Sequence, residues 1–125
     1  MACSVLIIED EPHIVESLRF ILGREGFDVT AVDSAESGLL HLENSPPDVL
    51  VLDAMLPGES GFDLLRRIRS REDLAALSVL MLTAKGQRKD REVAESLGAN
   101  RFMTKPFANA EVIAAVKELS TAARS

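Results

Sequence analysis

The sequence predicts an α/β fold, (βα)5, in which five β-strands alternate with five α-helices and form a doubly wound parallel sheet. Three uninterrupted apolar blocks, at residues 5–8, 49–52 and 79–82, are typical of central parallel strands covered on both faces. Longer stretches with apolar residues at helical spacing separate the strands. With 125 residues, of which 46% are apolar, the chain has the size of one compact domain with a sizeable core.

Two further segments are predicted to be strands at the edges of the sheet. Residues 27–32 partly alternate, because polar Asp28 and Thr30 interrupt the apolar residues. Residues 101–104 place Phe102 and Met103 among polar neighbours. Partial alternation indicates strands that are covered less completely than the central ones.

Each predicted strand is followed by apolar residues that recur every three or four positions, the period of an amphipathic helix. The first helix is expected to begin at Pro12, since proline suits a first helical position, and to end near Gly23 and Gly26. The five stripes are Ile14, Leu18 and Ile21; Ala35, Leu39 and Leu42; Phe62, Leu65 and Ile68; Val93, Ala94 and Leu97; and Val112, Val116 and Leu119. We expect a domain over residues 1–121, with residues 122–125 as a short C-terminal tail or the start of a linker.

Charge and composition argue against several classes of function. A formal net charge of −6 and a pI of about 4.9 argue against direct nucleic-acid binding by this chain, because such binding depends on Lys and Arg that meet phosphates. No apolar run reaches the roughly 18–20 residues of a membrane span, and no signal-peptide pattern opens the chain. The single cysteine, Cys3, cannot form an internal disulfide, so a cytoplasmic location is expected.

Polar residues follow several of the predicted strands, at the edge where ligands of open α/β sheets bind. Glu9 and Asp10 follow the first strand, Asp53 the third, Thr83 the fourth and Lys105 the fifth. Each residue alone has an ordinary explanation as a turn former, a helix-terminal charge or a surface residue. Together, three carboxylates at neighbouring strand ends repel one another, which should raise their pKa values or require a cation, because one lysine offsets only one charge. Oxygen ligands with a partly water-filled shell suit Mg²⁺.

This arrangement predicts phosphoryl transfer to a carboxylate. Asp53 would attack an activated phosphoryl group and become an acyl phosphate, while Mg²⁺ is held by Asp53 and Asp10 with Glu9 nearby. Lys105 and the Thr83 hydroxyl would contact the remaining phosphoryl oxygens. Positioning and charge neutralisation are the main means by which proteins catalyse such transfer.

Over essentially its full length the chain resembles the receiver domains of two-component response regulators. The residues that carry the resemblance are Ile7-Ile8-Glu9-Asp10-Glu11, Leu52-Asp53-Ala54-Met55-Leu56-Pro57 with Gly61, Leu82-Thr83-Ala84, Gly98-Ala99-Asn100 and Phe102-Met103-Thr104-Lys105-Pro106-Phe107. The resemblance implies a flavodoxin-like sheet with strand order 2-1-3-4-5. It also implies Asp53 as the phosphorylation site, Glu9 and Asp10 in the metal site, and the Met55 backbone carbonyl as a further metal ligand. Phe102 occupies the place of the switch aromatic residue.

The resemblance further implies a signalling switch rather than an enzyme, with only Mg²⁺-assisted self-phosphorylation and slow autodephosphorylation. The phosphoryl donor would be a sensor histidine kinase or a phosphotransfer protein. Thr83 and Phe102 would then reshape the face formed by the fourth helix, fifth strand and fifth helix, which controls an output domain or effector protein. A phosphorylation-dependent dimer stays open. Receivers that dimerise through this face often use a basic residue of the fifth helix, where this chain has Ala115 after Ala114.

Three other interpretations of the same residues compete with this one. A phosphatase of the haloacid dehalogenase type would need an acid/base Asp two residues after Asp53, where this chain has Met55. A flavodoxin-type FMN site would need a hydroxyl- and glycine-rich loop after the first strand, but Glu9-Asp10-Glu11 would repel a phosphate. A receiver that serves only as a protein-interaction module remains open, although no expected site residue is missing.

Overall fold

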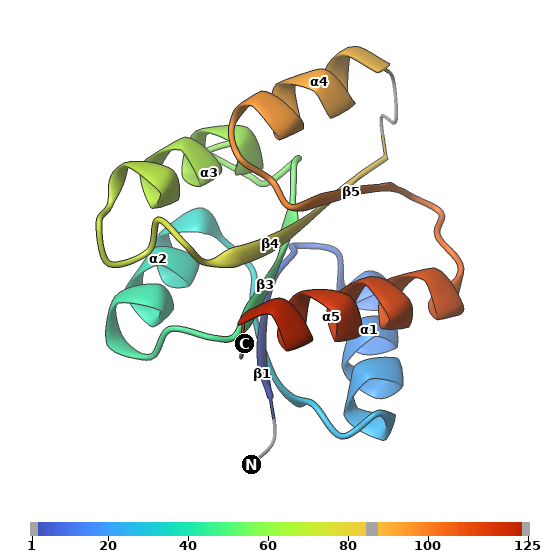
Figure 1. The fold of residues 1–125 in the computed structure, drawn as a ribbon. Helices are drawn as coiled ribbons and strands as arrows, with labels where there is room; N and C mark the ends of the chain where they lie inside the picture. Colours follow the sequence, from blue (N-terminus) through green and yellow to red (C-terminus); the bar gives the residue numbers. More distant parts are fainter. Residues whose placement is uncertain (1–2, 85–87, 124–125) are drawn as a thin grey trace.

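The computed structural model describes residues 3–84 and 88–123, and within them five parallel strands form one sheet flanked by five helices (Figure 1). The strands are β1 (Ser4–Ile8), β2 (Asp28–Val32), β3 (Val49–Asp53), β4 (Ser78–Thr83) and β5 (Arg101–Thr104). The helices are α1 (Pro12–Arg24), α2 (Ala35–Asn44), α3 (Gly61–Ser70), α4 (Arg88–Ser96) and α5 (Asn109–Ala123). The strand order is β2-β1-β3-β4-β5, which confirms the predicted fold and topology.

The order of the strands explains their different sequence patterns. β3 and β4 are buried along their whole length, and β1 is buried except at Ser4, whereas β2 at one edge alternates between exposed and half-buried residues. β5 forms the other edge, as predicted, and its first residue, Arg101, is exposed. β3 and β4 each extend one residue beyond the predicted apolar block, so Asp53 and Thr83 belong to the ladder: Asp53 pairs with Leu82, and Thr83 with Thr104.

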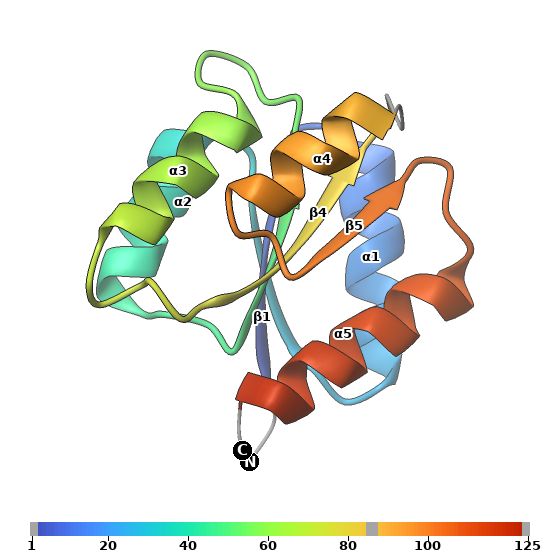
Figure 2. The same cartoon turned by 45° about the horizontal axis from the view of Figure 1, so that its top comes forward.

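Alternate residues of each strand point to opposite faces of the sheet and build two separate cores. Helices α1 and α5 cover one face, and α2, α3 and α4 cover the other, as Figure 2 shows. The α1–α5 core contains Val5, Ile7, Val49, Val51, Leu80 and Leu82 from the sheet. The opposite core contains Leu6, Ile8, Leu50, Leu52, Val79 and Met81. The crossovers on both faces leave the carboxyl ends of the strands together at one edge.

Helix α3 begins in close contact with the end of β3. The Ser60 hydroxyl accepts a hydrogen bond from the Asp63 amide at 3.2 Å and caps the helix. The Gly61 amide donates to the Ala54 carbonyl oxygen at 2.9 Å, which ties the first helical residue to the segment after Asp53. None of the helices in the described ranges has the length and apolar character needed to cross a membrane.

Gly61→Ala is predicted to destabilise the domain by about 2 kcal/mol or more in urea unfolding, because added atoms in a tightly packed place force the backbone to move. A Cβ atom at Gly61 would lie 2.1 Å from the Asp53 carbonyl oxygen and 2.8 Å from the Ala54 Cα atom. Gly23→Ala is the matched control, since a Cβ there meets nothing within 4 Å and alanine favours the helix. Equal losses of stability in both variants would contradict the packing argument.

Candidate functional site

Three carboxylates converge at the carboxyl ends of β1 and β3. Asp53 is the last residue of β3 and is buried, Glu9 directly follows β1 and is also buried, and Asp10 is exposed. One carboxylate oxygen from each of the three residues lies within 4.8 Å of the others. Among the described residues, this is the one acidic group with the spacing of a metal site. A pocket of about 450 Å³ opens over it, lined by Glu9, Asp10, Glu11, Pro12, Asp53, Met55, Ala84 and Lys105.

Backbone hydrogen bonds that continue the sheet hold the site segments in place. The Glu9 amide donates to the Val32 carbonyl oxygen at 3.1 Å, and the Ala54 amide donates to the Leu82 carbonyl oxygen at 2.8 Å. The Lys105 amide donates to the Thr83 carbonyl oxygen at 2.7 Å. The functional side chains therefore lie on short segments whose ends are fixed by the ladder, and little rearrangement is needed to bring them together.

Lys105 bridges the two buried carboxylates. Its Nζ atom lies 2.5 Å from Glu9 Oε1 and 3.4 Å from Asp53 Oδ2. Glu9 Oε2 also accepts a hydrogen bond from the Glu11 amide at 3.2 Å, and Asp53 Oδ1 accepts one from the Met55 amide at 3.1 Å. The ion pair with Glu9 is the closer of the two, so in this structure Lys105 primarily compensates the fully buried carboxylate.

The pKa values reflect this crowding. Burial raises the pKa of Glu9, the neighbouring Asp53 carboxylate raises it further, and Lys105 lowers it only in part. Burial alone would lower the pKa of Lys105, but the hydrogen bond to Glu9 and the negative charge of Asp53 outweigh it, so the pKa of Lys105 is raised. Three carboxylates against one ammonium leave excess negative charge, and this set of oxygen donors fits Mg²⁺.

The two remaining predicted residues, Thr83 and Phe102, are buried in β4 and β5. Thr83 ends β4 and is 1% exposed, and its neighbour Ala84 lines the pocket. Phe102 of β5 is 8% exposed and packs into the core on the side of α2, α3 and α4, so its ring is turned inward. The Arg91 guanidinium of α4 lies 5.2 Å from the centre of this ring, a cation–π contact. Arg91 could not be singled out from the sequence, because its contact with Phe102 depends on which side of α4 turns toward β5.

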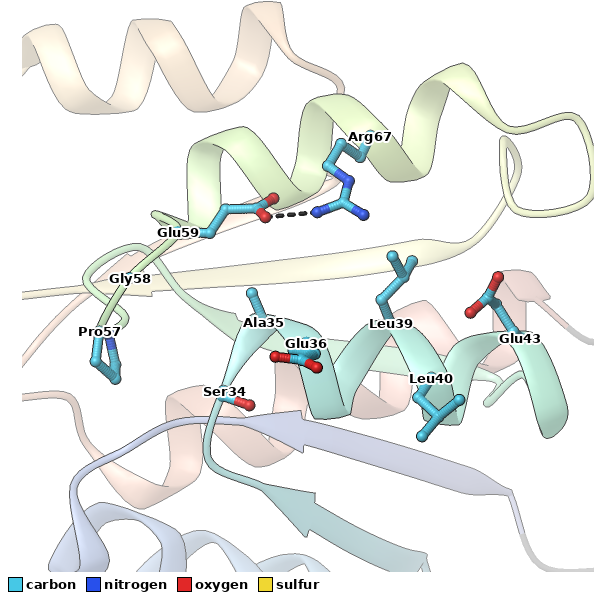
Figure 3. A pocket seen from close by; sticks show the side chains of 10 residues that line it. All are labelled: Ser34, Ala35, Glu36, Leu39, Leu40, Glu43, Pro57, Gly58, Glu59 and Arg67. Carbon is cyan, nitrogen blue, oxygen red and sulfur yellow. Dashed lines mark hydrogen bonds and ion pairs between the residues drawn. The ribbon is translucent and has the colours of Figure 1, made fainter.

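A second pocket, of about 510 Å³, lies between α2 and α3 and is shown in Figure 3. Two of its carboxylates are paired with arginines: Glu59 with Arg67 at 2.5 Å, and Glu43 with Arg71 at 2.8 Å. Its charges are thus largely compensated within the fold. The convergent carboxylates with too little compensating positive charge make the strand ends, rather than this groove, the candidate functional site.

Residues 5–117 match the family of the response regulator receiver domain. The chain belongs to this family. This receiver is 40% identical over 114 residues to the sensory transduction protein RegX3 of Mycolicibacterium smegmatis, and the match covers 91% of this chain and 49% of that protein. The chain therefore spans about half the length of this relative.

Solved receiver structures share the fold over the whole chain. A crystal structure described as a putative response regulator from Chloroflexus aurantiacus superposes with a TM-score of 0.93 at 31% identity, covering 97% of this receiver and 99% of that chain. The receiver domain of a sensor histidine kinase from Pseudomonas aeruginosa superposes with a TM-score of 0.86 at 27% identity, with both chains fully covered. That domain is described with a magnesium ion coordinated in its active-site cleft.

Lys105→Met is predicted to destabilise the metal-free domain by about 3 kcal/mol near neutral pH, because it leaves a buried carboxylate without its counter-charge. The pKa of Glu9 is already raised and rises further without Lys105, and protonation of Glu9 removes the buried charge. Stability of the variant should therefore increase as the pH falls through the raised pKa of Glu9 toward the ordinary glutamate pKa. Urea unfolding in a chelator at neutral and mildly acidic pH measures both effects.

Lys117→Met is the matched control for this measurement. Lys117 also pairs with a glutamate, Glu25, at 2.5 Å, but its side chain is 55% exposed. An exposed pair contributes little to stability, so this variant should lose less than about 1 kcal/mol with little pH dependence. If Lys105→Met behaved like Lys117→Met at both pH values, the buried pair would not have the importance assigned to it.

Proposed function

We propose that this receiver accepts a phosphoryl group on Asp53 in a Mg²⁺-dependent reaction and thereby switches the face formed by α4, β5 and α5. The observation that carries the proposal is the convergence of Glu9, Asp10 and Asp53 at one strand edge, with a single lysine to compensate them. The donor would be a sensor histidine kinase or a phosphotransfer protein, in line with the family to which the chain belongs.

Glu9, Asp10 and Asp53, together with the Met55 backbone carbonyl, would hold Mg²⁺, which when bound neutralises negative charge on the phosphoryl oxygens. An Asp53 carboxylate oxygen attacks the phosphorus atom of phosphohistidine. The bond between phosphorus and the imidazole nitrogen breaks, the imidazole leaves with the bonding electron pair, and an acyl phosphate forms on Asp53. Lys105 supplies positive charge at an adjacent oxygen.

The neighbouring side chain favours a switch over a hydrolytic enzyme. The side chain of Met55 is largely exposed beside the pocket, two residues after Asp53, and has no group that can move a proton. An acyl phosphate on Asp53 would therefore lack a side-chain acid/base at this position to speed its hydrolysis. Slow autodephosphorylation is the expected consequence, and the modified state would persist long enough to be detected by a partner.

Beryllofluoride, which mimics a phosphoryl group, tests the proposed site without turnover. With Mg²⁺ present it should shift the backbone amide NMR signals of residues 53–55 and of β5 in the wild-type chain. Asp53→Asn removes the carboxylate needed for binding and should abolish these shifts. A wild-type chain that responds to neither Mg²⁺ nor beryllofluoride would contradict the proposal and favour a receiver that acts only as an interaction module.

Thr83→Ala is predicted to leave modification of Asp53 largely intact while weakening the response of β5. The Thr83 hydroxyl would move toward the phosphoryl group, and Phe102, already packed inward, would be held there. Loss of this step should reduce the coupling between beryllofluoride binding and the Phe102 environment by about fivefold or more. Thr83→Ser keeps the hydroxyl and is the control. A full response in Thr83→Ala would remove Thr83 from the scheme.

The output remains a proposal, because the chain corresponds to about half of its relative RegX3. We propose that an output domain or effector protein binds the α4–β5–α5 face, and that the chain itself does not bind nucleic acid. Ala115 is fully buried, so Ala114 is the residue of this pair that reaches the surface. Arg101 of β5 already pairs with Glu118 of α5 at 2.7 Å. Positions 114 and 115 therefore offer no basic side chain, and the nearby Arg101 is already paired. Both observations weigh against a dimer that needs a basic residue of α5 at this place.

The domain boundary and the cellular location are two further proposals that rest on the sequence. The division into a domain over residues 1–121 and a tail or linker over residues 122–125 stays a prediction, and α5 continues to Ala123. A cytoplasmic location is likewise proposed from the single cysteine, which is buried.

A further inference from the structure

Helix α3 joins the phosphoacceptor strand to a distant turn of the fold. At its first residue, Gly61, the backbone lies so close to Asp53 that a Cβ atom would be 2.1 Å from the Asp53 carbonyl oxygen. Helix α3 is 10 residues long, about 15 Å, and this contact lies at its first residue, at the opposite end from its last turn. Arg69 lies in that last turn.

Arg69 hydrogen-bonds to three residues that lie in two separate segments. Its Nε and Nη2 atoms both donate to the Gly98 carbonyl oxygen, at 3.1 and 2.7 Å. Its Nη2 atom also donates to Asn100 Oδ1 at 3.0 Å, and its Nη1 atom donates to the Ala75 carbonyl oxygen at 3.1 Å. One guanidinium thus links α3 to the turn between α4 and β5, and to the loop that leads into β4.

The contact with the α4–β5 turn is closely fitted. Gly98 has a φ of +95°, and a Cβ atom there would lie 2.9 Å from Arg69 Nε. Asn100 is also hydrogen-bonded to Val79 of β4 at two points. Its side-chain Oδ1 atom accepts from the Val79 backbone amide at 2.8 Å, and its backbone amide donates to the Val79 carbonyl oxygen at 3.0 Å. Phe102 lies two residues further along the chain, in β5.

The chemistry of Arg69 points to positioning rather than to charge compensation. No ion pair among residues 3–84 and 88–123 involves Arg69, and all the acceptors of its hydrogen bonds are neutral oxygens. Burial of the guanidinium lowers the pKa of Arg69, as expected where no carboxylate lies against it. The planar fork of donors fixes direction as well as distance, which a lysine could not do.

We propose that Arg69 is a positioning residue that couples α3 to the α4–β5 turn, so that a change at Asp53 reaches β5 through α3 as well as through Thr83. The Met55 amide donates to Asp53 Oδ1, so modification of this carboxylate changes the restraint on the loop that leads into α3. A helix packed in a dense core moves as a unit, and its far end transmits the displacement to Gly98 and Asn100. This inference rests on the proposed function of Asp53.

The test compares the response of two regions to Mg²⁺ and beryllofluoride in Arg69→Ala. Amide NMR signals of residues 53–55 report binding at Asp53, and those of residues 98–102 report the response of the turn and β5. In Arg69→Ala we expect the shifts at residues 53–55 to be retained and those at residues 98–102 to fall to about half of the wild-type values or less.

Arg66→Ala is the matched control, because Arg66 is on the same helix but is 65% exposed and pairs only with Asp63 at 3.0 Å. It should respond as the wild type does. Arg69→Lys is measured in parallel, so that the test stands even if the alanine variant fails to fold. The lysine ammonium cannot make the directed hydrogen bonds of the guanidinium, so Arg69→Lys should show only part of the wild-type response at residues 98–102.

The outcomes separate the two proposals. Absence of any response to beryllofluoride in the wild type would overturn the proposed function itself. A wild-type response at both regions that is fully retained in folded Arg69→Ala, or in Arg69→Lys where the alanine variant does not fold, would overturn the coupling role alone. A lower melting temperature with an undiminished response at residues 98–102 would assign Arg69 a purely structural role and would likewise overturn the inference.

Discussion

The interaction on which the site depends is the pairing of one half-buried ammonium with two buried carboxylates. Lys105 lies 2.5 Å from Glu9 and 3.4 Å from Asp53, while Asp10 adds a third carboxylate at the pocket mouth. Burial makes each charge costly, and a single lysine cannot balance the set. The site therefore has an excess of negative charge that a cation would offset, and under the proposed function a phosphoryl group that arrives with bound metal would change that balance. This imbalance gives a small domain a chemically addressable switch.

The sheet makes this crowding tolerable. Parallel strands end at the same edge, so β1, β3 and β5 bring Glu9, Asp53 and Lys105 together without long loops. Two independent cores, one under α1 and α5 and one under α2, α3 and α4, fix the strands on both faces. Stability is thus supplied away from the site, and the site residues are free to be selected for chemistry.

The fold and the site could largely be predicted from the sequence, for identifiable reasons. Continuous apolar blocks predicted the central strands β1, β3 and β4, and interrupted blocks predicted the edge strands β2 and β5. A strand that is covered on both faces has apolar residues at every position, whereas a less covered strand also has polar ones. The convergence of Glu9, Asp10 and Asp53 followed from the shared edge of a parallel sheet. The contacts of Arg69 with Gly98 and of Arg91 with Phe102 could not be predicted, since they depend on how α3 and α4 are placed relative to the sheet.

We propose that Asp53 is chemically modified because of the charges around it. Incubation with acetyl phosphate and Mg²⁺, borohydride reduction of the acyl phosphate and mass-spectrometric peptide mapping would locate the modified residue directly. The account predicts a single phosphoryl group on Asp53, which is lost when Mg²⁺ is chelated before the reaction. Modification at another residue, or equal modification of Asp53 without Mg²⁺, would contradict it.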